Sequence, residues 1–143
     1  MNTFNEICAR HTLGVARYMY EHAKDYKLNA ENMFLLGWTH DIGLVFEHDN
    51  HEKRGGALLM YNGYPLRYCI AVGAHGDSLF ETGHVPEELM LLIEADMHIS
   101  SITGEYVSYE KRLDEIKRTH GKDSPEYRIS EDNIAYLRHA GRA

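Results

Sequence analysis

Apolar residues recur at helical spacing along almost the whole chain, and no segment alternates between apolar and polar residues as a half-exposed strand does. Ile7 and Val15, for example, fall on one face of a helix at this spacing. The chain has only three prolines, and each stands where a helical pattern starts, at Pro65, Pro86 and Pro125. The pattern therefore predicts an all-α fold, a compact bundle of six or seven helices with antiparallel neighbours.

Capping residues and helix breakers give the expected bounds of these helices. In chain order we expect a helix from the capping box Thr3-Phe4-Asn5-Glu6, one from Asn29 to a C-cap at Gly43, one from Glu52 to Asn62, one from Pro65 to about His75, one from Pro86 to about Ile99, one from Ser108 to Gly121, and one from Ser124 to Gly141 with Ser130 as an alternative start.

The length of 143 residues predicts one domain that spans residues 1–143. No apolar run approaches the ~20 residues that cross a bilayer. The first ten residues also lack the basic and apolar stretches of a secretory signal. We therefore expect a cytoplasmic protein with no membrane partner.

The balance of acidic and basic residues limits the kinds of partner that the chain is expected to bind. Fifteen Lys and Arg stand against 22 Asp and Glu, which gives a formal net charge of −7. Such a chain repels a phosphate backbone, so polymeric DNA or RNA is not an expected partner. A small anionic substrate is still compatible with this net charge if local cations or a metal ion make the electrostatic potential positive in one pocket.

The two cysteines, Cys8 and Cys69, are far apart and have apolar neighbours. We interpret both as small core residues in a reducing compartment and not as a disulfide or a catalytic pair.

Histidines and aspartates at apolar positions point to a metal site. His11 and Asp96 lie on inward faces of their predicted helices, and His40-Asp41 adjoins the most hydrophobic stretch of the chain. Buried carboxylates without partners cost several kcal/mol each, and a divalent cation would remove that cost. Imidazole and carboxylate together suit Fe, Mn, Ni, Co or Zn. A hydrogen-bonded core pair for His11 and Asp96, and a solvated Asp41, remain the alternatives.

These residues and their neighbours resemble a known family. His11, then His40-Asp41 within Trp38-Thr39-His40-Asp41-Ile42-Gly43, then Asp96 within Ala95-Asp96-Met97-His98-Ile99-Ser100 are similar to the H…HD…D signature of the HD-domain metal-dependent phosphohydrolases. The resemblance extends from His11 to about Ile116. It implies the all-α HD-domain fold and metal-assisted hydrolysis of a phosphate ester or anhydride.

Two further histidines extend the resemblance to the binuclear members of the superfamily. His51 opens His51-Glu52-Lys53-Arg54-Gly55-Gly56, and His75 stands before Gly76. The order H…HD…H…H…D is similar to that of HD-type diadenosine tetraphosphate hydrolases, HD-GYP phosphodiesterases and some di-iron oxygenases. The HD-GYP signature itself is absent, since no Lys follows Gly43 and no second His follows His75.

The resemblance implies a role for each of these residues. Asp41 would bridge two metal ions and orient the nucleophilic water. His11, His40 and Asp96 would complete one site, and His51 with His75 the other, with His48 as a competitor for the place of His51. One or two divalent ions are therefore expected. His98 lies two residues past Asp96 and is expected to point elsewhere.

Cations near these ligands would neutralise the phosphoryl charge that develops during hydrolysis. Lys53 and Arg54 are the best candidates because they closely follow His51. Arg17, nearly two turns beyond His11, is a further candidate for the mouth of the pocket, and Arg67 and Arg112 are weaker candidates. Glu47 and Asp77 are candidates for orienting ligands or carrying protons.

The sequence thus predicts a metal-dependent phosphohydrolase that acts on a small phosphorylated substrate, most readily a nucleotide. A di-iron oxygenase of the same fold is the first alternative, and a regulatory ligand-binding module with a vestigial metal site is the second. The sequence leaves the oligomeric state open, a homodimer included.

Overall fold

The computed structural model describes residues 4–45 and 50–142, which form α-helices and two short 3-10 helices. The α-helices are α1 (Phe4–His22), α2 (Ala30–Thr39), α3 (His51–Tyr61), α4 (Leu66–Ala74), α5 (Glu87–His98), α6 (Tyr109–His120) and α7 (Pro125–His139). The 3-10 helices are η1 (Ala23–Tyr26) and η2 (Ile42–Val45). In these residues the only β pairing is a single antiparallel bridge between Ile99 and Tyr106. The predicted all-α bundle is confirmed.

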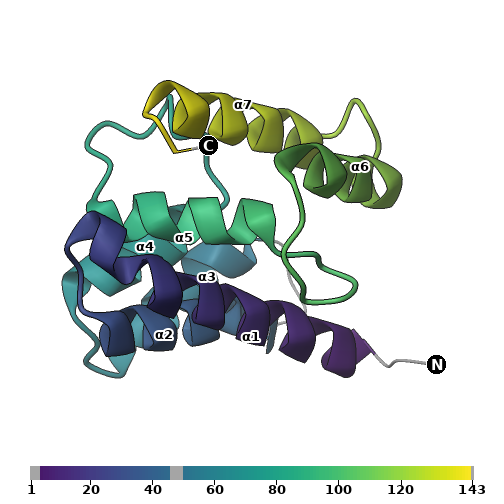
Figure 1. The fold of residues 1–143 in the computed structure, drawn as a ribbon. Helices are drawn as coiled ribbons and strands as arrows, with labels where there is room; N and C mark the ends of the chain where they lie inside the picture. Colours follow the sequence, from purple (N-terminus) through teal and green to yellow (C-terminus); the bar gives the residue numbers. More distant parts are fainter. Residues whose placement is uncertain (1–3, 46–49, 143) are drawn as a thin grey trace.

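Helix α5 is the centre of the bundle (Figure 1). The hairpin of α1 and α2 packs below it, α3 and α4 pack against each other behind it, and α6 and α7 lie above. Nine of the 12 residues of α5 are buried, and Leu89, Leu91 and Leu92 have no exposed surface. A helix that is buried on nearly all sides is the core of its domain. Among the described helices, none is long and apolar enough to cross a membrane.

Three predicted caps begin their helices as expected. The Asn29 side chain accepts a hydrogen bond from the Asn32 amide, and the Ser108 and Ser124 hydroxyls accept from amides three residues on. Ser130 does not start a new helix, because α7 is continuous and the Ser130 hydroxyl donates to the Glu126 carbonyl. Thr3, at the predicted first cap, lies outside the described residues.

The predicted role of Gly43 as a C-cap is wrong. Helix α2 ends at Thr39 with His40 as its C-cap, and Gly43 lies within η2 without a positive φ. A Cβ atom on Gly43 would stand 1.7 Å from the carbonyl oxygen of His51 and 2.9 Å from the amide nitrogen of Gly55. Gly43 is therefore needed because the backbones of η2 and α3 touch there.

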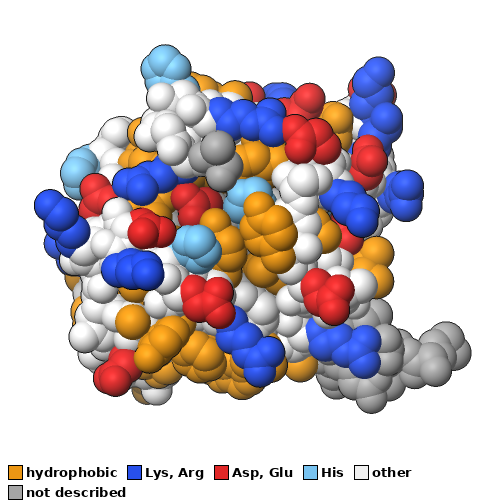
Figure 2. Space-filling model, viewed as in Figure 1, with side chains coloured by type: hydrophobic (Ala, Val, Ile, Leu, Met, Phe, Trp, Pro, Cys, Tyr) orange, Lys and Arg blue, Asp and Glu red, His pale blue; other side chains and the backbone are white. Residues whose placement is uncertain are grey.

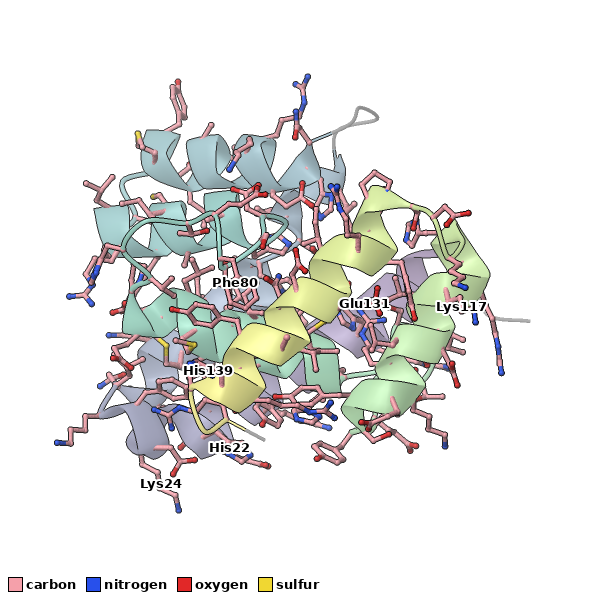
Figure 3. The ribbon with its side chains drawn as sticks, turned by 90° about the horizontal axis from the view of Figure 1, so that it is seen from above. His22, Lys24, Phe80, Lys117, Glu131 and His139 are labelled. Atoms are coloured by element: carbon pink, nitrogen blue, oxygen red, sulfur yellow. The ribbon has the colours of Figure 1, made fainter. Side chains whose placement is uncertain are left out.

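The loop that follows α4 is fastened to α7. The buried Asn133 side chain accepts from the Leu79 amide and donates to the Asp77 carbonyl. Seen from above, α7 crosses obliquely over the rest of the bundle, and Phe80 lies beside it (Figure 3), with its ring 5.3 Å from that of Tyr136. These contacts hold the first part of the loop, directly after His75.

A buried carboxylate joins α5 to the N-terminal hairpin. Glu94 accepts hydrogen bonds from the hydroxyls of Tyr18, at 2.7 Å, and Tyr26, at 2.9 Å. The Arg142 guanidinium covers the Tyr26 ring at 4.0 Å from its centroid. Burial, together with the Glu94 charge, raises the pKa of both phenols well above the usual value.

We expect the free energy of unfolding to fall as the pH rises above about 10, the ordinary pKa of tyrosine. The unfolded chain releases its phenolic protons there, whereas folded Tyr18 and Tyr26 keep theirs, so stability is full below that pH and is lost above it. Urea unfolding at pH 8 and near pH 10.5 measures the difference. Tyr26→Phe should show a smaller fall, and an equal fall in this variant would contradict the assignment.

The buried cysteine is confirmed for Cys69, whose thiol is free and lies 3.6 Å from the Tyr64 carbonyl. The side chain of Cys8 lies outside the described part of the chain.

Candidate metal centre

The six predicted ligands converge from the first five α-helices. His11 comes from α1 and Asp96 from α5, while His51 is the first residue of α3. The others stand at helix ends: His40 is the C-cap of α2 and precedes Asp41, and His75 is the C-cap of α4. His11, His40 and His75 are buried, at 6%, 0% and 6% exposure. Residues far apart in the sequence therefore form one centre.

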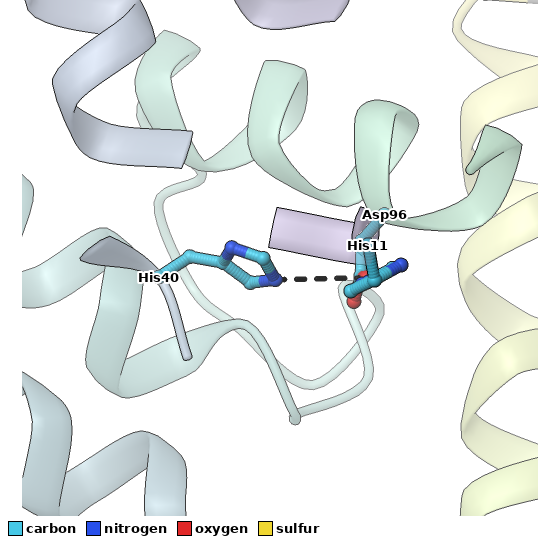
Figure 4. Close-up of side chains that lie close together, drawn as sticks. All are labelled: His11, His40 and Asp96. Carbon is cyan, nitrogen blue, oxygen red and sulfur yellow. Dashed lines mark hydrogen bonds and ion pairs between the residues drawn. The ribbon is translucent and has the colours of Figure 1, made fainter. Parts of the chain in front are cut away.

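One cluster contains His11, His40 and Asp96 (Figure 4). The Nε2 atom of His11 lies 2.7 Å from Asp96 Oδ1, and that of His40 lies 3.8 Å from the same oxygen. The ligand atoms of all three residues lie within 4.8 Å of one another. This set of two imidazoles and one carboxylate is compact enough to hold a single ion.

Asp41 faces a second pair of histidines. Its Oδ1 atom lies 3.2 Å from the Nε2 atom of His51 and 3.2 Å from that of His75. Its other oxygen, Oδ2, lies 3.2 Å from the Nε2 atom of His40. One oxygen of the Asp41 carboxylate thus faces two imidazoles, and the other oxygen faces a third.

Three of the imidazoles are oriented by backbone carbonyls. The Nδ1 atoms of His40 and His75 lie 2.6 Å from the carbonyl oxygens of Gly37 and Val72. The Nδ1 atom of His11 lies 3.3 Å from the Ser100 carbonyl. A carbonyl oxygen only accepts, so each Nδ1 carries the proton and donates it. The Nε2 atom of each ring then faces the cluster, as in metal sites whose other ring nitrogen is hydrogen-bonded.

The buried Nε2 atom of His40 shows that the residues fit a metal ion. This atom makes no hydrogen bond, although the ring has no exposed surface. Buried polar atoms are nearly always paired, so an unpaired one requires an explanation. An ion held by His11, His40 and Asp96 would use that lone pair, and the N and O donors suit Fe, Mn, Co, Ni or Zn.

The charges within the cluster hold its carboxyl groups ionised. Burial alone would raise the pKa of Asp41, but His40, His51 and His75 keep it well below the usual value. Burial likewise opposes the ionisation of Asp96, and His11 and His40 outweigh it. Burial lowers the pKa of His40, yet the Asp41 and Asp96 carboxylates raise it well above the usual value. A cation bound at this centre would therefore compete with a proton for His40.

Arg112 supports Asp96 from the side of α6. This buried guanidinium donates from Nε to the Asp96 carbonyl at 2.9 Å and from a terminal nitrogen to the Ser101 hydroxyl at 2.7 Å. Its other terminal nitrogen lies 3.8 Å from Asp96 Oδ1. Arg112, a weaker candidate for phosphate contact in the sequence, is thus placed to position Asp96, a predicted ligand.

The two main candidates for phosphate contact lie on the exposed surface of α3. The Lys53 ammonium donates to the Gly73 carbonyl at 2.6 Å and to the Asp77 carboxylate at 2.8 Å. Arg54 follows it along the helix. Contact of Lys53 and Arg54 with a substrate stays a prediction.

The other sequence candidates lie elsewhere. Arg67 pairs with Glu88 at 3.0 Å, and Arg17 lines a cavity of about 550 Å³ beside α1 that none of the six ligands lines. Glu47 and His48 fall outside the described residues. His98 points away from the centre, as expected: it donates to the Val107 carbonyl, and its ring stacks on that of Tyr109.

The sequence interpretation missed Glu52. Its Oε1 atom lies 3.5 Å from the Nε2 atom of His51, and Glu52 forms a potential metal-binding group with His51 and His75. Adjacent residues on a helix normally point in different directions. The position of Glu52 directly after His51 therefore gave no indication that both side chains face the same cluster.

Comparison with known proteins gives one match. The family described as HD domain matches residues 8–126, which is most of the chain and includes the six predicted ligands and Glu52. Searches of curated proteins and of solved structures found no match.

Proposed function

The chain belongs to the HD-domain family, and on that basis we propose that it is a metal-dependent phosphohydrolase acting on a nucleotide or another small phosphate ester. Members of this superfamily are generally metal-dependent hydrolases. Of the residues in the family signature, His11, His40 and Asp96 form one cluster, and Asp41 lies beside it with its Oδ2 atom 3.2 Å from His40 Nε2.

The observation that carries the proposal is the position of Asp41. One of its oxygens faces His40 and the other faces His51 and His75, all at 3.2 Å. A carboxylate shared in this way suits a pair of ions, and paired ions are typical of enzymes that hydrolyse phosphate esters. We therefore propose that His11, His40 and Asp96 hold one ion, that His51 and His75 hold another, and that Asp41 serves both.

Bound divalent ions would lower the pKa of a water molecule towards neutrality and polarise a phosphoryl oxygen. The chain supplies the geometry. The carbonyls of Gly37 and Val72 fix the rings of His40 and His75, and Arg112 fixes Asp96. In the hydrolysis, the water oxygen forms a bond to phosphorus, the bond from phosphorus to the leaving oxygen breaks, and that oxygen takes up a proton.

Lys53 and Arg54 are proposed to bind the phosphoryl group at the mouth of the centre. Lys53 ends beside Asp77, two residues after His75, so its ammonium lies next to the segment that carries a ligand. Figure 2 shows acidic and basic side chains interspersed over the face of the molecule that it presents, with no continuous basic stripe. We therefore expect a phosphate to be attracted by a nearby cationic side chain and not by the electrostatic field of that whole face.

The test is phosphate release from a panel of nucleotides and dinucleoside polyphosphates. The chelated protein is compared with protein given Mn²⁺, Fe²⁺, Co²⁺ or Ni²⁺. We expect turnover of at least one substrate to rise roughly 100-fold or more on addition of metal, because the ion generates the nucleophile. Metal binding without phosphate release from any substrate would contradict the proposal. Oxygen consumption by the iron-loaded protein would then identify an oxygenase of the same fold.

A further inference from the structure

We infer that Glu52 is a further metal ligand, which completes a second ion site with His51, His75 and the shared Asp41. The ligand atoms of His51, Glu52 and His75 lie within 4.8 Å of one another. The side chain of Glu52 is only 22% exposed, although α3 lies at the surface, and its Oε1 atom lies beside the imidazole of His51. The carboxylate is therefore directed towards the cluster.

The composition of the two clusters supports this role. The first cluster has two imidazoles and a carboxylate of its own, from His11, His40 and Asp96. Without Glu52, the second would have only two imidazoles and a share of Asp41. With Glu52, each cluster has two imidazoles, one carboxylate of its own and one oxygen of Asp41. Divalent transition ions bind such mixed sets of nitrogen and oxygen donors.

Gly76 supplies an independent observation. A Cβ atom at this position would stand 2.3 Å from Glu52 Oε1 and 2.6 Å from Glu52 Cδ. The φ of Gly76 is not positive, so the backbone itself does not require glycine there. The absence of a side chain directly after His75 instead makes room for the Glu52 carboxylate. An acidic residue that only favoured the start of α3 through the helix dipole would need no such space.

The experiment measures metal content and not turnover. Metal-free protein is titrated with Mn²⁺ by calorimetry, and the electron paramagnetic resonance spectrum is recorded at each ratio. We expect the wild type to bind two Mn²⁺ per chain and to show the spectrum of an exchange-coupled pair. Glu52→Gln should keep the first Mn²⁺ with unchanged affinity, lose roughly 100-fold or more in affinity for the second, and show the spectrum of a single ion.

Gly76→Ala offers a second variant that keeps the carboxylate but displaces it. The added methyl group meets only the flexible end of Glu52, so the fold should be preserved while the second Mn²⁺ is weakened. Gly73→Ala is the matched control, because a Cβ atom there meets nothing within 4 Å. It should bind two Mn²⁺ as the wild type does.

Three outcomes would overturn the inference: one Mn²⁺ per wild-type chain, an unchanged second affinity in Glu52→Gln, or an effect of Glu52→Gln on turnover alone. The inference rests on the proposed function only in that ions bind at this centre. Protein that binds two Mn²⁺ through Glu52 but releases no phosphate would refute the hydrolase and leave the ligand assignment standing.

Discussion

Asp41→Ala is expected to reduce metal-dependent hydrolysis roughly a thousand-fold or more and to lower the metal content at both clusters. One Asp41 oxygen faces His40 and the other faces His51 and His75, so its removal would take a proposed ligand from two sites at once. Bound ions would supply several kcal/mol of transition-state stabilisation, and each 1.4 kcal/mol is about tenfold in rate.

Turnover and elemental analysis of the same purified samples check this expectation, and circular dichroism shows that the helices persist. Asp25→Ala is a suitable control, since Asp25 is an exposed residue of η1 that pairs with His22. It should retain both ions and full turnover. Wild-type turnover in Asp41→Ala would mean that the ligand assignment is wrong.

Gly43→Ala is expected to produce the largest loss of stability among single-methyl changes. The added Cβ atom would meet backbone atoms of His51 and Gly55, which cannot move without shifting α3. Overpacking usually costs about 1–3 kcal/mol, and a clash with backbone lies at the upper end or beyond. The shift would also move His51 away from Asp41, so affinity for the second ion should fall as well.

Urea unfolding of the metal-free protein measures this change in the free energy of unfolding. Gly83→Ala, in the loop between α4 and α5, places its Cβ atom in open space and should stay within about 0.5 kcal/mol of the wild type. If Gly43→Ala unfolded at the same urea concentration as Gly83→Ala, the close approach of η2 and α3 would not be a constraint on the fold.

The helix caps and Gly43 show what the sequence could and could not predict. Helix starts depend on local hydrogen bonds, so Asn29, Ser108 and Ser124 were identified from their side chains alone. Gly43 was assigned to a helix end because glycine is common there, whereas its actual reason is contact with a helix that begins eight residues later. Such contacts between elements leave no local pattern.

The candidate site likewise has some features that the sequence predicts and others that it does not. Polar residues on apolar helix faces predicted that His11 and Asp96 are directed inward, and the structure brings them to 2.7 Å. The positions of the Asp41 oxygens and of Glu52 depend on how the start of α3 meets the end of α4. Periodicity specifies which face of a helix is buried, but it does not specify where the end of one helix meets the start of another.

The fixed orientation of the His40 and His75 rings affects how quickly the centre can take up and release a metal ion. Each ring is held by a carbonyl three residues earlier in its own helix, so its orientation is set before any ion arrives. An incoming cation then meets the Nε2 atom of each ring with no rotation of the ring and no rearrangement of the backbone. The rate of uptake should therefore depend on how an ion reaches the cluster from solvent, and a chelator should remove the ion without unfolding the bundle.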